Sequence, residues 1–149
     1  MPESISILEQ MRELFATQRL AVLATDYSGL PYASLVAFAV SDDLRELFFA
    51  TSRETRKFAN LKSNNRVSLL IDNRSNQVAD FSQAIAVTIL GVGEELAETA
   101  RAVSEALYLA KNPHLEEFVT APSCAFVRVR VQSYYLVSRF QNVIEYHFS

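Results

Sequence analysis

The chain has 149 residues, a formal net charge of −3 at pH 7 and 50% hydrophobic residues. These values predict one folded domain over residues 1–149, and the acidic balance argues against nucleic-acid binding, which depends on a basic surface. A single cysteine and two histidines exclude an internal disulfide, a Cys-x-x-Cys metal site and any site that needs three histidines. No apolar run is long enough to span a membrane, so we expect a cytoplasmic protein without membrane contact.

Glycine is scarce, which excludes several nucleotide-binding and hydrolase motifs. The three glycines are Gly29, Gly91 and Gly93. A dinucleotide-binding fingerprint and a phosphate-binding loop each need more glycines than this chain contains. The Gly-x-Ser-x-Gly turn of serine hydrolases is missing as well.

The first half of the chain begins with a helical pattern and continues with strand patterns. Apolar residues recur at helical spacing over residues 3–18, which predicts an amphipathic helix. Turn-forming residues separate short β-prone runs after it. The strands predicted from these runs are residues 20–25, 32–40 and 46–51. Residues 51–54 spell a Ser/Thr-x-x-Glu capping box, and a short helix follows up to residue 62.

The second half of the chain is dominated by strand patterns. Residues 73–82 are polar and predict a loop, and residues 98–111 predict a helix. The predicted strands are residues 66–71, 84–96, 124–137 and 142–148. Glycine within residues 84–96 indicates a β-bulge. Six or seven strands joined by short helices predict a mainly β protein of the α+β type, built as one antiparallel barrel.

Two cations fall at an unfavourable position in the short helix that follows Glu54. Arg56 and Lys57 lie in its first turn, where positive charges oppose the helix dipole at a cost of about 0.3–1 kcal/mol each. One interpretation is surface charge tolerated in water and partly neutralised by Glu54. The other is a bound anion, because the free amides of the helix start, the Thr51 and Ser52 hydroxyls and the two cations would together hold a phosphate.

Two segments carry a pattern that occurs in one known family. Residues 48–70 run from a strand through Thr51, Thr55-Arg56-Lys57 and a short helix to Asn-x-x-Val-x-Leu. Residues 23–36 contain Leu-Ala-Thr followed by Gly-x-Pro-Tyr-Ala-Ser-Leu-Val. Both segments resemble the pyridoxamine 5′-phosphate oxidase-like family of FMN-binding proteins. The resemblance covers residues 18–96 well and the C-terminal third loosely, and it implies a six-stranded antiparallel split β-barrel.

The resemblance also implies a cofactor, an assembly and a set of contact residues. In this family FMN lies in a groove between the two subunits of a homodimer. The candidate cofactor-binding residues are Ser34, Leu35, Val36, Ala50, Thr51, Ser52, Arg56, Lys57 and Gln83. The Arg-Lys pair would grip the FMN phosphate, the strand at 34–36 would run along the isoalloxazine, and the residues at 51 and 52 would add hydroxyl and amide donors. Ala50 stands where the family often has an aromatic residue, and Gln83 lies close to the position of a family glutamine, which falls near Ala86.

The departures from the family pattern shape the expected function. The chain has no tryptophan, and no segment matches the arginine-containing C-terminal part that binds the vitamin phosphate. We therefore expect an FMN-dependent oxidoreductase that acts on an unidentified small molecule, with the flavin supplying the redox chemistry. The alternatives are a haem-binding or haem-degrading split barrel that uses His114 or His147 as ligand, a non-catalytic flavin-binding protein, and a cofactor-free structural dimer.

The remaining candidates have structural interpretations. The acid pairs 42–43, 94–95 and 116–117 are expected on turns or solvated faces, and Cys124 is expected to be a small core residue. Tyr134 and Tyr135 are expected to cover a dimer seam rather than to stack on a ligand. The strand at 142–148 is expected to complete the barrel or to contact the partner.

Overall fold

The computed structural model describes residues 3–139 and 142–148. The strands are β1 (Leu20–Tyr27), β2 (Leu30–Val40), β3 (Glu46–Ser52), β4 (Arg66–Asp72), β5 (Ile85–Glu95), β6 (Cys124–Ser138) and β7 (Asn142–His147). The helices are α1 (Glu3–Thr17), α2 (Arg56–Ser63), α3 (Asp80–Gln83), α4 (Ala102–Lys111) and α5 (Glu116–Thr120), with short 3-10 helices η1 (Glu98–Ala100) and η2 (Pro113–Leu115). The predicted strands and longer helices are all present, and α3 interrupts the loop expected at 73–82. None of the helices in the described ranges is long and apolar enough to cross a membrane.

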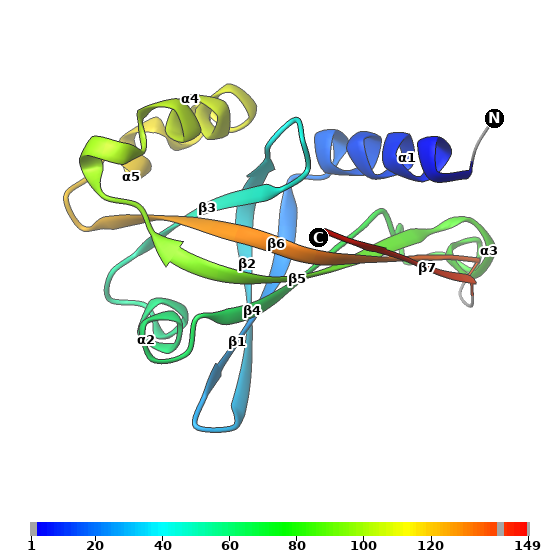
Figure 1. The fold of residues 1–149 in the computed structure, drawn as a ribbon, viewed down its shortest axis with the longest axis horizontal. Coiled ribbons are helices and arrows are strands. Elements are labelled where there is room, and N and C mark those ends of the chain that lie inside the picture. The colour runs from blue at the N-terminus through cyan, green and yellow to red at the C-terminus, as the bar shows by residue number, and fades with distance from the viewer. Residues whose placement is uncertain (1–2, 140–141, 149) are drawn as a thin grey trace.

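Six of the strands close into an antiparallel barrel, as predicted. The sheet order is β3-β2-β1-β4-β5-β6-β7, and a further pairing of β3 with β6 closes the ring. β6 is 15 residues long. Along one of its edges, residues 124–130 pair with β3 and residues 133–138 pair with β7. The expectation that the last strand completes the barrel is therefore wrong, because β3 already closes the ring and β7 lies outside it (Figure 1).

One apolar cluster fills the barrel interior, and the helices α1 and α2 both pack against it. Among its fully buried members are Leu23, Phe38, Leu69, Ile89 and Tyr134. The helix α1 contributes Met11, Leu14 and Phe15, and α2 contributes Phe58 and Leu61. These two helices lie on opposite sides of the barrel (Figure 1). The amphipathic patterns of both helices are thus explained by burial against the same core.

Tyr134 belongs to this core, so its predicted place at a dimer seam is wrong. It is 1% exposed, and its hydroxyl donates a hydrogen bond of 2.6 Å to the Leu44 carbonyl oxygen. Leu90 pairs with Ser133 and Gly91 with Val131, so Gln132 is an extra residue in β6. An extra residue reverses which side chains face inward. It turns Tyr134 into the core and leaves Tyr135 half-buried on the outer side.

A second apolar cluster lies on the outside of the barrel, beneath α4 and α5. Phe48 and Phe126 stack with ring centroids 5.9 Å apart, and Tyr108 of α4 meets Phe126 edge-on at 5.5 Å. Cys124 is buried in this cluster, as predicted. α4 and α5 therefore cover β3 and the first part of β6, and they leave the outer side of β1, β4 and β5 to other contacts.

Gly91 provides the close approach that the bulge requires. A Cβ atom built on Gly91 would lie 2.6 Å from the Arg130 carbonyl oxygen and 2.7 Å from Val129 Cγ1. Since the nearest atom belongs to the backbone, it has little freedom to move away. The bulge predicted from glycine within residues 84–96 is therefore present, at the register shift between Leu90 and Gly91.

Replacing Gly91 with alanine is expected to lower the free energy of unfolding by about 1–3 kcal/mol, the usual cost of overpacking. Gly93→Ala is the matched control, because its Cβ would meet the flexible end of Leu61, at 2.8 Å, rather than backbone. Urea unfolding followed by circular dichroism measures both variants. An equal or smaller loss for Gly91→Ala would contradict the bulge explanation.

Candidate functional site

The barrel opens where β2 and β3 separate. β2 pairs with β3 at Phe38, Ala39 and Val40, whereas residues 30–37 of β2 pair with β1 along the other edge. Beyond Phe49, β3 no longer pairs with β2, while its pairing with β6 along the other edge continues. Alternate residues of an antiparallel strand direct their backbone N–H and C=O groups to opposite edges. About half of the backbone groups in residues 32–36 therefore face the opening. We call this opening, between residues 32–36 of β2 and residues 50–52 of β3, the split.

The helix α2 begins beside the split and is capped by Thr55. Thr55 Oγ1 accepts a hydrogen bond of 3.3 Å from the Phe58 amide and lies 2.8 Å from Thr51 Oγ1. The capping box predicted at residues 51–54 is therefore wrong, because Thr55 and not Thr51 takes the N-cap position. Thr51 is buried, and its hydroxyl braces the cap. The sequence analysis placed Thr55 in the family motif but did not predict it as the N-cap, although a threonine directly before an Arg-Lys pair is the signal for it.

Arg56 and Lys57 occupy the first turn of α2, which contains no acidic residue. Arg56 is exposed, and Lys57 is half-buried. The Arg56 guanidinium carbon lies 5.9 Å from the ring centroid of Tyr32 on β2, and this contact joins the helix start to the split. Tyr32 is a residue that sequence reasoning did not assign to the site.

No ion pair neutralises these two cations within the described part of the chain. The exposed Glu54 was expected in one interpretation to do so, but the ion pairs found among the described residues include neither Arg56 nor Lys57. Two cations and the positive end of a helix dipole therefore add their fields at one place. That combination suits an anion such as a phosphate.

The side chains of the three candidates on β2 differ in direction and in exposure to solvent. Val36 faces the core and is 5% exposed, whereas Leu35 faces outward and is 63% exposed. The Ser34 hydroxyl is buried and has no hydrogen-bond partner. An unsatisfied buried hydroxyl costs about 1–3 kcal/mol, so Ser34 Oγ is available to bond to a polar group that enters the split.

The candidates on β3 lie on the opposite side of the split. Ala50 is 8% exposed and packs in the outer cluster under α4. Ser52 is half-buried, and its hydroxyl accepts a hydrogen bond of 3.3 Å from the Glu54 amide. Tyr108 of α4 donates a hydrogen bond of 3.1 Å to the Ala37 carbonyl oxygen, at the end of the split where β2 and β3 meet. The structure thus brings together the candidates of β2, β3 and α2.

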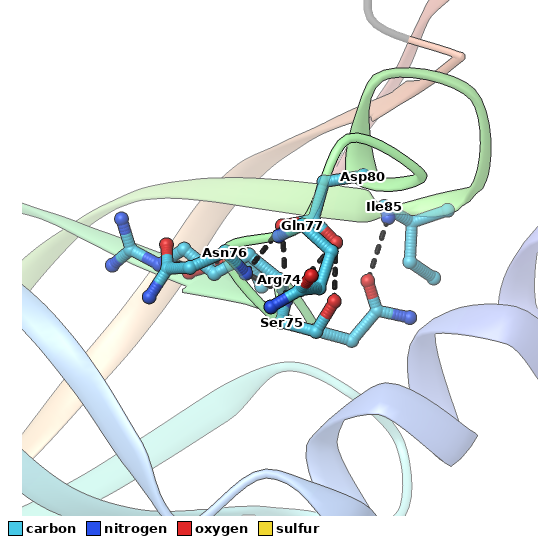
Figure 2. Close-up of polar contacts among 8 residues, drawn as sticks. Arg74, Ser75, Asn76, Gln77, Asp80 and Ile85 are labelled. Carbon is cyan, nitrogen blue, oxygen red and sulfur yellow. Dashed lines mark hydrogen bonds and ion pairs between the residues drawn. The ribbon is translucent and has the colours of Figure 1, made fainter.

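Gln83 lies far from this group within one chain. It is an exposed residue at the end of α3, which Figure 1 shows on the side of the barrel away from α2. The loop before it is organised by Asp80, whose carboxylate accepts hydrogen bonds of 2.9 Å from the Ser75 amide and 2.7 Å from the Asn76 amide (Figure 2). These bonds, the one from Ser75 foremost, lower the pKa of Asp80.

Neither histidine lies at the split. His114 is exposed in η2. His147 lies on β7, with Nδ1 2.7 Å from Ser133 Oγ and Nε2 2.9 Å from a Glu145 carboxylate oxygen. Both ring nitrogens of His147 are engaged, so binding of a haem iron there would require one of these bonds to break.

The acid pairs have structural roles, as expected. Glu94 forms ion pairs with Arg128 and Arg130, and the hydrogen bond from Arg128 is the main cause of its lowered pKa. A hydrogen bond from the Ser41 hydroxyl lowers the pKa of Asp43 in the turn between β2 and β3. The described residues contain no cluster of three or more His, Cys, Asp or Glu side chains that could hold a metal ion.

The outer side of β1, β2, β4 and β5 carries several apolar side chains next to Ser68 and Thr88, and we call this surface the outer sheet face. Because side chains alternate across a strand, the neighbours of the buried core residues point outward here. The members of this face are Leu20, Val22, Leu35, Leu70, Leu90 and Val92. Leu20 is 53% exposed and Leu90 is 36% exposed. Exposed apolar patches are common at protein interaction sites.

A closed six-stranded barrel with a split beside a cation-bearing helix defines the class of split-barrel proteins. A sequence profile of the family described as "Pyridoxamine 5'-phosphate oxidase" matches residues 7–138. The match covers most of the chain, so this chain belongs to the pyridoxamine 5′-phosphate oxidase family, as the sequence resemblance indicated. No curated protein matches the chain.

Solved structures with the same fold include proteins named for the binding of different cofactors. A heme binding protein from Mycobacterium smegmatis superposes with a TM-score of 0.82 at 21% identity, over 94% of this chain and 57% of that one. A protein related to general stress protein 26, from Clostridium acetobutylicum, gives 0.73 at 18%, over 96% and 95%. An FAD-binding protein from Mesorhizobium loti gives 0.68 at 18%, over 86% and 91%. The chain thus spans little more than half of the mycobacterial protein, and these likenesses establish the shared fold.

Proposed function

We propose that this protein binds FMN at the split and is an FMN-dependent oxidoreductase acting on a small molecule. The observation that carries the proposal is the pair of unneutralised cations at the start of α2, placed beside a strand edge with free backbone groups. Arg56 and Lys57 would hold the phosphate with the first amides of α2. The backbone of residues 34–36 would run along the isoalloxazine, and the Ser34 hydroxyl would gain a polar partner.

The proposed site is completed by a second copy of the chain. The outer sheet face offers a two-fold related copy an apolar surface that extends to Leu35, at the rim of the split. Sheets packed through this face would place a groove between the two copies, with the split of one copy as one wall. Gln83 of the second copy is the candidate for the other wall. A cytoplasmic location is part of the proposal and agrees with the single buried cysteine.

The residues at the split are suited to binding the cofactor, and the redox chemistry would be carried out by the cofactor itself. FMN, when bound, supplies hydride transfer. The candidate residues offer amides, hydroxyls and two cations, which orient an anionic ligand and donate hydrogen bonds to it. No Asp, Glu or His is among them, so the chain's own role would be binding and orientation rather than acid–base catalysis.

The absorbance spectrum of the purified protein, with mass identification of what heat releases, tests the cofactor. We expect a flavin spectrum, FMN in the released fraction, and bleaching of the flavin by a reduced nicotinamide or deazaflavin donor under anaerobic conditions. Protein purified without cofactor is first incubated with FMN and, separately, with haem. A Soret band on adding haem, with no binding of FMN, would overturn the proposal in favour of the haem alternative. Bound FMN that no donor reduces would favour a flavin-binding protein that is not an enzyme.

A further inference from the structure

A second cavity lies between α1 and α4, outside the proposed flavin site. Its volume is about 400 Å³, and none of its lining residues is a flavin-site candidate. Its walls are largely apolar, formed by Phe15, Ala39, Leu44, Leu107 and Ala110. The cavity also receives the side chain of Lys111, the last residue of α4.

Hydrogen bonds on both sides of Lys111 hold the end of α4 in place. One turn before it, the Tyr108 hydroxyl is bonded to β2 at Ala37. Directly after it, the buried Asn112 donates hydrogen bonds of 3.3 Å to the Phe38 carbonyl oxygen and 3.1 Å to the Tyr108 carbonyl oxygen. The lysine is thus held at a buried junction and is not free to swing out on a flexible helix end.

The Lys111 amine contacts a carbonyl oxygen and an aromatic ring, and it has no anionic partner in the described part of the chain. Nζ donates a hydrogen bond of 2.7 Å to the Phe15 carbonyl oxygen and lies 3.5 Å from the ring centroid of Phe38. A neutral amine has two N–H bonds and one lone pair. The carbonyl oxygen and the aromatic face attract an N–H bond of the amine in either protonation state, and the neutral amine keeps its lone pair beside the cavity that Lys111 lines.

Burial of the side chain, more than the surrounding charge, favours the neutral amine. Burial, followed by the positive charge of Arg19, lowers the pKa of Lys111 to about 8. Two further charged groups line the cavity, namely Arg12 on α1 and Asp42 in the turn after β2, and Arg12 donates to the Asp42 backbone carbonyl oxygen at 3.3 Å. With a pKa near 8, about a quarter of the amine is unprotonated at pH 7.5, against about one in a thousand for an ordinary lysine.

We propose that Lys111 is a nucleophilic lysine that binds small, mainly apolar aldehydes as imines in the cavity between α1 and α4. The lone pair of Nζ attacks the carbonyl carbon and forms a C–N bond, giving a carbinolamine. The C–O bond then breaks, and the carbonyl oxygen leaves as water with the two amine hydrogens. The step is reversible and needs no oxidant or reductant. A desolvated lysine amine in an apolar pocket is the arrangement that such covalent chemistry uses.

The chain is well suited to a direct test, because its three lysines are Lys57, Lys62 and Lys111. Intact protein is incubated with benzaldehyde and cyanoborohydride, which traps any imine as a stable secondary amine, and peptide mass spectrometry then gives the rate at each lysine and at the N-terminal amine. At pH 7.5 we expect Lys111 to react at least about 10-fold faster than the other two lysines, as its larger neutral fraction predicts. Its rate should level off above pH 8, while theirs continue to rise. Equal rates at all three lysines would overturn the proposal.

Two variants separate a reactive cavity from a merely exposed amine. Lys111→Arg keeps the positive charge and should abolish the fast labelling. Ala110→Leu should narrow the cavity and slow trapping of benzaldehyde at Lys111 at least about 10-fold, with the circular dichroism spectrum unchanged, because Ala110 lines the cavity and the larger side chain leaves less room for the ring. Formaldehyde, which needs little space, should still label Lys111 in that variant. Unchanged benzaldehyde trapping in folded Ala110→Leu would show that the aldehyde does not enter the cavity, and the proposal would fail.

Discussion

Replacing both Arg56 and Lys57 with alanine is expected to weaken FMN binding at least about 100-fold, because each charge-assisted contact to a phosphate contributes about 1.5–3 kcal/mol. Riboflavin lacks the phosphate, so its affinity should change little. The fold should survive, since the two cations are not part of the core and oppose the dipole of α2. Titration of apoprotein with each flavin, followed by flavin fluorescence, measures both affinities.

The matched control for this experiment removes two positive charges elsewhere. Lys62 lies at the other end of α2, and Arg66 begins β4, and both are exposed. The double variant Lys62→Ala/Arg66→Ala has the same net charge as the test variant and should bind FMN nearly as tightly as the parent. If FMN affinity is the same in the test variant and the parent, the two cations are surface charge. If riboflavin is lost together with FMN, the pair supports the structure of the split instead.

Sedimentation of the purified protein is expected to show a dimer at micromolar concentration, and Leu20→Glu/Leu90→Glu is expected to convert it to a 16.7 kDa monomer. Both leucines belong to the outer sheet face, and neither is a candidate flavin contact. A two-fold interface would bury each new carboxylate twice without a partner, which should weaken dimerisation at least about 100-fold. If the groove lies between copies, FMN binding should be lost in the same variant.

The control for the dimer experiment places the same charge away from this face. Val78 and Val103 are both 85% exposed, in the loop before α3 and on α4. Val78→Glu/Val103→Glu should therefore remain a dimer that binds FMN. A monomeric parent protein would contradict the dimer proposal. A monomeric test variant that still binds FMN would place the cofactor within one chain and leave Gln83 without a role.

Much of the fold could be predicted from local patterns, because those patterns record contacts between near neighbours. The 3.6-residue periodicity of α1 and the alternation in β1 and β4 reflect which side chains meet the core, and the strands appeared where predicted. The cap of α2 is an instructive failure. Thr51 and Thr55 both have capping side chains, and the choice between them depends on how far β3 extends beside β6, which is a long-range pairing.

The same distinction separates the candidates within the site. Arg56 and Lys57 could be identified locally, since two cations in one helical turn conflict with the helix dipole wherever the helix lies. Gln83 could not be placed, because its distance from α2 depends on the course of β4 and β5 around the barrel. Tyr32 was missed because its contact with Arg56 joins segments that are separated by a whole strand and a turn.

The sequence by itself determined the family, the strands and the longer helices, and the cations that point to an anionic ligand, since each of these depends on residue type and near spacing. Only the tertiary structure decided which residues meet. The extra residue Gln132 turned Tyr134 inward, because one added residue reverses the two faces of a strand. Lys111 is partly removed from water, and its amine contacts the carbonyl oxygen of Phe15, 96 residues away, and the ring of Phe38. Burial is a property of the packed chain, and the chemistry that burial creates becomes visible only when distant segments are in place.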